Sequence, residues 1–148
     1  AGKFIKGNAT EQLNTDHHYY DAATFELFAG GLIKDKKLFA SHMAEYNQHN
    51  RAMKDANRGY IRFNSSDSYE NQEWPFAGLR VAVAQNHLGS KVEAKKMINR
   101  ITTFANRNHN LVPEILTNDM NLYSGAIPMV GYGSAAYVLA VLDYYNHQ

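Results

Sequence analysis

Apolar residues recur at helical spacing in separate segments of this chain, and glycine or proline stands at most segment ends. The clearest segment follows Ser90, a predicted N-cap with Glu93 at the capping-box position, and is expected to end near Asn106. Its apolar stripe consists of Val92, Met97, Ile98, Ile101 and Phe104. No segment shows the long alternation of a half-buried sheet, so the pattern predicts an all-α fold.

Two earlier segments also have helical patterns. A largely buried helix is expected from about Asp16, its N-cap, to Leu32, with Gly30 and Gly31 as the stop. An amphipathic helix is expected from Lys34 or Asp35 to about Gln48. The link between them is short, which predicts an antiparallel helix hairpin.

The second half of the chain contains two more breaks. Tyr60 to Phe63 fits a brief strand, and a helix is expected from Trp74-Pro75 to Leu88, stopping at Gly89. A last helix, Ser134 to about Tyr145, is apolar almost all round, so we expect it to be deeply buried. If the chain acts alone, this helix is expected to leave an apolar patch that drives association. The order of segments favours one domain built from stacked helix pairs.

Composition excludes several classes of function. The 148 residues carry a net charge of +1, which gives no basic surface for nucleic acid. No apolar run approaches the roughly 20 residues needed to cross a bilayer, so no membrane partner is expected. There are no cysteines, and therefore no disulfide or thiolate metal site. The compartment is left open, with a periplasmic or secreted location favoured over a cytoplasmic one.

One trio of residues has the donor types of a metal site. His42, Glu45 and His49 share one face of the second expected helix, at positions i, i+3 and i+7. This spacing differs from the tight H-E-x-x-H zinc arrangement. A solvated or partly packed helix face is the simpler interpretation, and no metal is expected.

A set of polar and aromatic groups falls at helix starts. Pro113 favours an extended Val112 and so places Glu114 on a loop. On position alone Glu114 is a solvated acid, Arg62 a surface or salt-bridged arginine, and Trp74 a core residue. If helix pairs stack side by side, however, these loops gather on one rim, where catalytic groups are commonly placed. The full set is Asp21, Arg62, the Ser65–Glu70 loop with Asp67, Trp74, Glu114 and Tyr132.

Four ordered segments resemble glycoside hydrolase family 15, the glucoamylases and their bacterial relatives. They are YYDAATFELFAGG, GYIRFNSSDSYENQEWPFAGLRVAVAQNHLG, LVPEIL and GAIPMVGYGSAAYVLAVLDYY. The second is similar to the family's Gly-x-Arg-Tyr segment and Trp-Pro helix start. LVPEIL is similar to the segment that carries the family's catalytic base.

The resemblance implies an (α/α)6 toroid around a pocket for the non-reducing end of an α-glucan, with glucose released by inversion and no cofactor. By motif position Glu114 is the expected base, activating water opposite a general acid roughly 6.5–9.5 Å away. Arg62 is expected to bind sugar hydroxyls and Trp74 to line the pocket. Tyr132 stands near a position where the family has a Trp. Asp21 and Asp67 complete the expected substrate-binding set.

The chain departs from the family pattern in three respects. Ile115 replaces the Gln that usually follows the base, and the family's upstream Trp-Glu acid segment is missing. The only Trp here, Trp74, follows Glu73 instead of preceding a Glu. Five helices also cannot close a ring of twelve. We therefore expect the C-terminal part of a larger catalytic domain, inactive without the N-terminal remainder as its partner.

Other functions stay open. A trehalase or an α-1,6-glucosidase of a related toroid family has similar helix starts and Glu segments. A helical-repeat module that binds protein or glycan without chemistry is the alternative from a different class.

Overall fold

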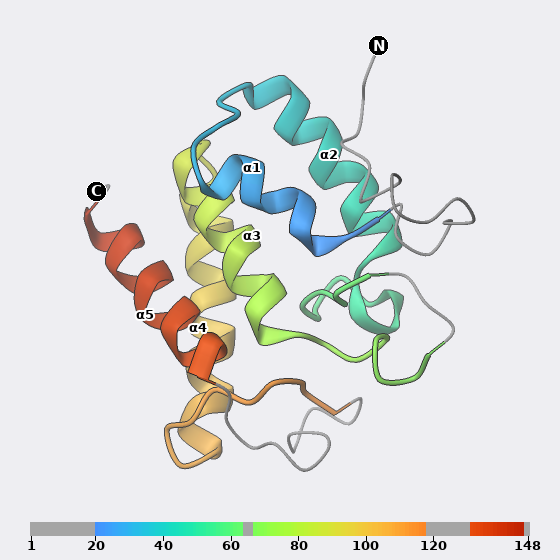
Figure 1. The fold of residues 1–148 in the computed structure, drawn as a ribbon, viewed down its shortest axis with the longest axis vertical. Coiled ribbons are helices and arrows are strands. Elements are labelled where there is room, and N and C mark those ends of the chain that lie inside the picture. The colour runs from blue at the N-terminus through green and yellow to red at the C-terminus, as the bar shows by residue number, and fades with distance from the viewer. Residues whose placement is uncertain (1–19, 64–66, 118–130, 147–148) are drawn as a thin grey trace.

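The computed structural model describes residues 20–63, 67–117 and 131–146 of the chain. These residues form an all-α fold, and no strand is assigned within them. The elements are drawn in Figure 1. They are η1 (Ala22–Phe25), α1 (Glu26–Ala29), α2 (Lys36–His49), η2 (Ala52–Lys54), α3 (Pro75–His87), α4 (Lys91–Arg107) and α5 (Gly131–Asn146).

Helix α3 is the centre of the fold and packs against α1, α4 and α5 (Figure 1). Small residues along it, such as Ala77 and Gly78, let neighbouring helices approach closely. A Cβ on Gly78 would lie 2.8 Å from the Sδ of Met97 on α4, so a side chain there would displace the end of Met97. The core of the described residues is therefore built around one almost fully buried helix.

The hairpin of α3 and α4 follows its sequence signals. Trp74 is extended before Pro75 at the first helical position, and Gly89 has a φ of +94°, a left-handed conformation suited to glycine. The predicted bounds of both helices are confirmed to within one residue. The capping box is wrong, because Ser90 makes no side-chain cap bond and Glu93 instead pairs with Lys96 at 2.7 Å.

The first hairpin is shorter than predicted. Asp21 is extended, its Oδ1 accepts the amide of Ala23 at 2.7 Å, and η1 begins only after it. The long helix expected up to Leu32 is therefore wrong: helical structure ends at Ala29, and Leu32 is 79% exposed. Asp16 lies outside the described residues. The glycine stop is confirmed, with Gly31 at a φ of +73°.

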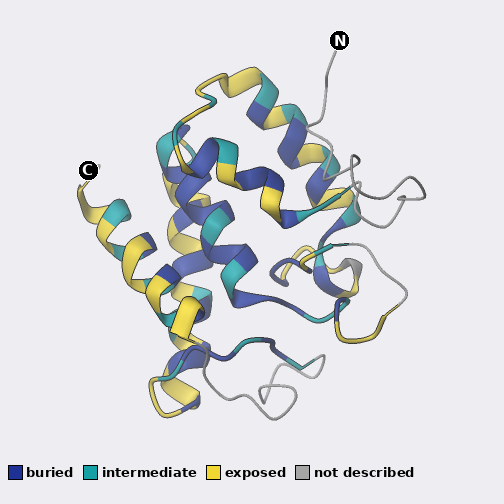
Figure 2. Ribbon diagram, viewed as in Figure 1, coloured by how far each residue is buried: buried dark blue, intermediate teal, exposed yellow. Residues whose placement is uncertain are grey.

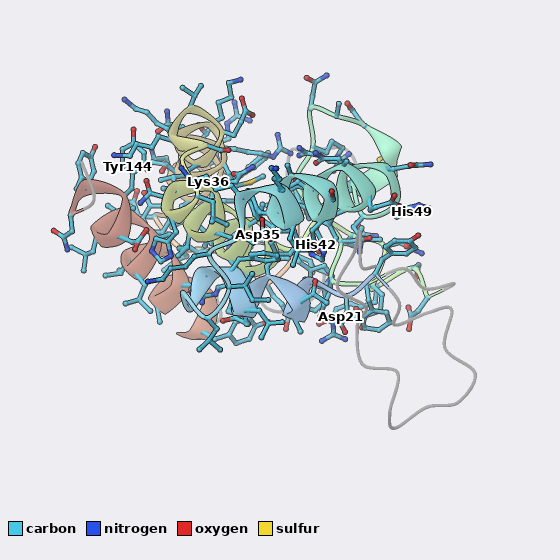
Figure 3. All side chains as sticks on the ribbon, turned by 90° about the horizontal axis from the view of Figure 1, so that it is seen from above. Asp21, Asp35, Lys36, His42, His49 and Tyr144 are labelled. Carbon is cyan, nitrogen blue, oxygen red and sulfur yellow. The ribbon has the colours of Figure 1, made fainter. Side chains whose placement is uncertain are left out.

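Helix α2 begins as predicted, with Asp35 as the N-cap of the helix. Its inner face joins η1 and α1 through rings. Phe25 meets His42 at 4.7 Å and Tyr46 at 4.5 Å between ring centroids, both edge to face. Figure 3 shows His42 between α2 and the η1–α1 segment. This aromatic cluster joins the first hairpin to the core.

Helix α5 lies on the surface. Ala136 and Ala140 are buried, while the larger side chains Val138, Leu139, Leu142 and Tyr145 are each more than half exposed. Figure 2 shows the exposed outer side of this helix. The expectation of deep burial is wrong for the described residues, because a uniformly apolar helix needs neighbours on every side to be buried, and here they lie on one side.

The brief strand expected at Tyr60–Phe63 is also absent as a strand. Tyr60 pairs with Arg51 and Phe63 with Asp21, each through one isolated antiparallel bridge. Two different partners in succession give an extended connection without a ladder.

Candidate functional site

Backbone hydrogen bonds hold the segments before two helices beside the segment after α4. The amide of Ala22 donates to the carbonyl of Arg62 at 2.8 Å, and the amide of Trp74 donates to the carbonyl of Tyr60 at 2.8 Å. The amide of Leu116 donates to the carbonyl of Glu73 at 2.9 Å. Chain positions almost 100 residues apart therefore form one edge of the molecule.

Glu114 lies on this edge, and both of its carboxylate oxygens accept hydrogen bonds from tyrosines. Tyr69 Oη donates to Oε2 at 2.6 Å, and Tyr132 Oη donates to Oε1 at 2.9 Å. Tyr69 belongs to the turn before α3, and Tyr132 to the first turn of α5. The carboxylate is partly exposed and is held between two separate elements.

The same contacts fix the protonation of the two hydroxyls. The hydrogen bond to Glu114, followed by partial desolvation, raises the pKa of Tyr69 to about 12. Burial and then the hydrogen bond to Glu114 raise the pKa of Tyr132 well above its ordinary value. Both hydroxyls therefore stay protonated near neutral pH and act as donors. A carboxylate has about four lone-pair directions, so two remain for water or a ligand.

Trp74 lies behind Glu114 and is 3% exposed. The Tyr69 ring meets its indole edge to face at 5.2 Å, and the Arg62 guanidinium lies over its ring at 4.6 Å. Among the described residues no acceptor lies within hydrogen-bond distance of the indole Nε1. Trp74 thus supports the groups in front of it, and exposed aromatic surface here comes from Tyr69 and Tyr132, which are 41% and 45% exposed.

Arg62 is held by Glu70, the last residue of the predicted Ser65–Glu70 loop, for which the sequence predicts no role of its own. Its Nε donates to Glu70 Oε2 at 2.9 Å and its Nη2 donates to Glu70 Oε1, a bidentate ion pair. Glu70 is buried, whereas the Arg62 side chain is 45% exposed. The expected sugar-binding arginine is therefore partly neutralised and fixed in place.

Asp67 and Asp21 have local roles. Asp67 Oδ1 accepts the amide of Tyr69 at 2.8 Å and so shapes the turn that carries that tyrosine. Asp21 caps η1, and its backbone pairs with Phe63, next to Arg62. Figure 3 shows Asp21 at the start of η1. The structure thus joins Arg62, Trp74, Tyr132 and Glu114 through side chains, Asp67 through the turn, and Asp21 through the backbone.

Tyr69 is the main residue that sequence reasoning missed. It lies within the predicted Ser65–Glu70 loop, in which only Asp67 is predicted as a site residue. The available signal was an aromatic residue two positions after an aspartate in a polar turn, a place where a ring gains little from the core. Its contact with Glu114 spans 45 residues, which no local pattern shows.

A groove of about 320 Å³ continues from Tyr132 between α3 and α5. Phe76 meets the Tyr132 ring edge to face at 5.4 Å, and Ala136 and Leu139 form the α5 side. The ion pair of Arg80 with Glu26, at 2.5 and 2.6 Å, closes the other side. A mostly apolar groove therefore adjoins the carboxylate.

Glu73 points away from this site. Successive side chains of an extended segment point to opposite sides, and while Trp74 faces Arg62, Glu73 is 1% exposed and binds Arg100 at 2.7 and 2.6 Å. Arg58 lies 3.8 Å from the same carboxylate. The Glu beside the only Trp is thus a structural ion-pair partner.

The residues of the considered metal trio separate in the structure. His42 is buried against Thr24, with His42 Nε2 and Thr24 Oγ1 3.0 Å apart, and burial lowers the pKa of His42 to about 4. His49 stacks on Tyr20 at 3.9 Å and lies 3.8 Å from Glu45. Among the described residues no group of three potential ligands is close enough to hold a metal ion.

Within the described ranges, no helix combines the length and the apolar character needed to cross a bilayer.

Comparisons with known proteins give no match: no family model, no curated protein and no solved structure is significantly similar to this chain.

Proposed function

We propose that this chain supplies the catalytic base and part of the sugar-binding rim of an inverting glycoside hydrolase that releases glucose from the non-reducing end of an α-glucan. The observation that carries the proposal is the Glu114 carboxylate, held at both oxygens by Tyr69 and Tyr132. The segment resemblance to glycoside hydrolase family 15 gives the reaction class.

The geometry supports a base more than an acid. A general base must be ionised, oriented and accessible to a water molecule. Two tyrosine hydroxyls donate to the two oxygens of Glu114 and restrict its rotation, while its partial exposure leaves a route for water. In an inverting mechanism this water attacks the anomeric carbon and its proton passes to the Glu114 carboxylate, while the glycosidic C–O bond breaks and the leaving oxygen takes a proton from the general acid.

The surroundings suit a sugar. Exposed Tyr69 and Tyr132 offer ring surface for the apolar faces of a pyranose, and the Arg62 guanidinium beside them offers donors for hydroxyl groups. The groove beside Phe76 gives further apolar surface next to the carboxylate. These features favour a neutral, hydroxyl-rich substrate.

In this proposal the helix hairpins are part of an (α/α)6 toroid. The remaining hairpins of the catalytic domain would supply the general acid, roughly 6.5–9.5 Å from Glu114, and cover α5. Glu73 is committed to Arg100 and is therefore not a candidate for this acid, which we expect on the remaining hairpins. We therefore expect the 148-residue chain alone to be inactive.

The test is Glu114→Gln in the complete catalytic domain, assayed for glucose release from maltotetraose. Loss of the base predicts a decrease in kcat of at least about a hundredfold with little change in KM. Glu45→Gln, a change of the same chemistry at a partly exposed glutamate of α2, is the control and leaves kcat unchanged. Anomeric analysis of the first product distinguishes inversion from retention.

Two results would overturn the proposal. Unchanged activity in Glu114→Gln would move the base elsewhere and favour a binding module. Hydrolysis by the verified 148-residue chain alone would contradict the divided site. Trehalose and isomaltose, assayed beside maltotetraose, decide between this function and a trehalase or an α-1,6-glucosidase.

A further inference from the structure

A second cavity lies behind Glu73, away from the tyrosines of Glu114. It has a volume of about 300 Å³ and lies between the Arg51–Tyr60 connection and the helices α3 and α4. Pockets for small molecules begin at about this size. The charged residues of its lining are Arg51, Arg58, Glu93, Lys96 and Arg100, and its amide side chains are those of Asn57 and Gln85.

The lining has a surplus of positive charge. Four cations, Arg51, Arg58, Lys96 and Arg100, face two carboxylates, that of Glu93 in the lining and that of Glu73 behind it, so 4 − 2 leaves +2. Because the chain as a whole has a net charge of +1, this surplus is a local concentration of charge. A partly enclosed site with this balance attracts an anion with two charges.

Arg51 is positioned by neutral groups. Its guanidinium lies over the Tyr60 ring at 4.1 Å, Nη1 donates to the carbonyl of Arg58 at 2.6 Å, and Nε donates to Asn47 Oδ1 at 3.1 Å. None of these partners cancels its charge. The arginine is therefore oriented in advance, which reduces the entropy lost when it binds an anion.

Lys96 can also turn towards the cavity. Its partner Glu93 is on the surface, and the side chains are 67% and 52% exposed. Ion pairs this exposed contribute little to stability. The ammonium group can therefore leave Glu93 for a ligand at a small free-energy cost.

Gln85 supplies a separate observation. It is 7% exposed and lines the cavity, and no donor among the described residues lies within hydrogen-bond distance of its Oε1. Buried amide oxygens normally have a partner. A ligand hydroxyl would donate to this oxygen. In the alternative orientation, with the amide flipped by a half-turn, its NH2 group would donate to an oxyanion.

From this cavity, its surplus charge and its unpartnered amide, we propose a binding site for the phosphoryl group of a small phosphorylated ligand. Arg51 and Lys96 bind the phosphoryl oxygens, and Gln85 makes a polar contact at the base of the cavity. The site is separate from Glu114, and the inference does not depend on the proposed hydrolase function.

The probe is inorganic phosphate, titrated into the full chain at constant ionic strength with chloride as the balancing anion and followed by amide NMR shifts. We expect saturable shifts at Asn57, Arg58 and Gln85. Lys96→Met should weaken binding about tenfold, while the matched control Lys95→Met, an exposed neighbour on α4 outside the cavity, should leave it unchanged.

Arg51→Met should abolish saturation, and Arg51→Lys should restore part of it. Thermal unfolding of each variant separates lost binding from lost folding. If Arg51→Met unfolds the chain, the difference in phosphate affinity between Lys96→Met and Lys95→Met still tests the site. Linear shifts without saturation, or equal weakening by the two lysine variants, would show general charge screening and overturn the proposal.

Discussion

The carboxylate of Glu73, one residue before Trp74, forms a two-point ion pair with the guanidinium of Arg100 on α4, with distances of 2.7 and 2.6 Å. The glutamate is 1% exposed and Arg58 lies beside it, 4% exposed. This contact ties the start of α3 to the middle of α4. It places a buried carboxylate beside the guanidinium groups of two arginines.

Removing this carboxylate should destabilise the fold strongly. In Glu73→Ala two arginines remain close together without their counter-charge, and the free energy of unfolding should fall by about 3 kcal/mol. Chemical denaturation measures this free energy of unfolding. The control is Glu93→Ala, which removes an exposed pair and should cost less than about 1 kcal/mol. Equal losses in the two variants would mean that Glu73 is not an essential partner.

His42 should make the fold sensitive to acid. Burial lowers its pKa to about 4, below the value of about 6.5 expected in the unfolded chain. The neutral form is therefore favoured by folding. Its contribution to stability is complete above pH 6.5 and is lost as the pH falls through about 4.

The matched variant is His42→Gln, which keeps a polar group near Thr24 but cannot titrate. The stability difference between the parent chain and this variant should shrink as the pH falls from 7 to 4, by up to about 3 kcal/mol. His109→Gln, at an exposed position, is the control. A difference that does not vary with pH would contradict the assignment.

The Tyr69 hydroxyl should lose its proton at a higher pH than an ordinary tyrosine. Its pKa is raised to about 12 by Glu114, against about 10 in the unfolded chain, so its contribution is present below pH 10 and is lost as the pH rises through about 12. Ultraviolet absorbance of tyrosinate follows this step. In Glu114→Gln, the part of the absorbance change that occurs at high pH should move towards pH 10. In Tyr69→Phe, one tyrosine that ionises at high pH should be missing from the curve. A titration curve identical in all three proteins would exclude the hydrogen bond in solution.

The exposed face of α5 should promote self-association of the isolated chain. Val138 and Leu142 are 54% and 53% exposed and lie one helical turn apart, next to Leu139. Sedimentation velocity should show association that increases with concentration and decreases in Val138→Lys/Leu142→Lys. Ala44→Lys adds charge at an exposed position of α2 and serves as the control. A monomer at all concentrations would show that this apolar face is tolerated by the free chain.

Much of the helical fold could be predicted from local signals. Pro75 and Gly89 fix the ends of α3, and Asp35 fixes the start of α2, because each acts within one turn. The sequence predicts that the first helix begins at Asp16, although Asp21 has the same capping chemistry and is the N-cap of η1. Two equivalent caps within six residues cannot be ranked without the bridge from Asp21 to Phe63.

The site was harder to predict, because its contacts are not local. Glu114, Arg62 and Trp74 were chosen from loops and motif likeness, and the structure places them near one another. The partners that fix them, Tyr69 and Glu70, lie in the predicted Ser65–Glu70 loop, but the sequence predicts no individual role for either. A tyrosine hydroxyl or a carboxylate in a polar turn looks solvated in sequence, and only tertiary structure shows what it binds.

The extended Glu73–Trp74 peptide lies between the Glu114 site and the cavity behind Glu73. Adjacent residues face opposite sides, so inserting or deleting one residue within this extended peptide would exchange the faces, sending the indole towards Arg100 and the carboxylate towards Arg62. Substitution of exposed residues in the preceding turn, such as Ser68, leaves this alternation unchanged. The positions of these two residues along the extended peptide therefore determine which side chain faces each site.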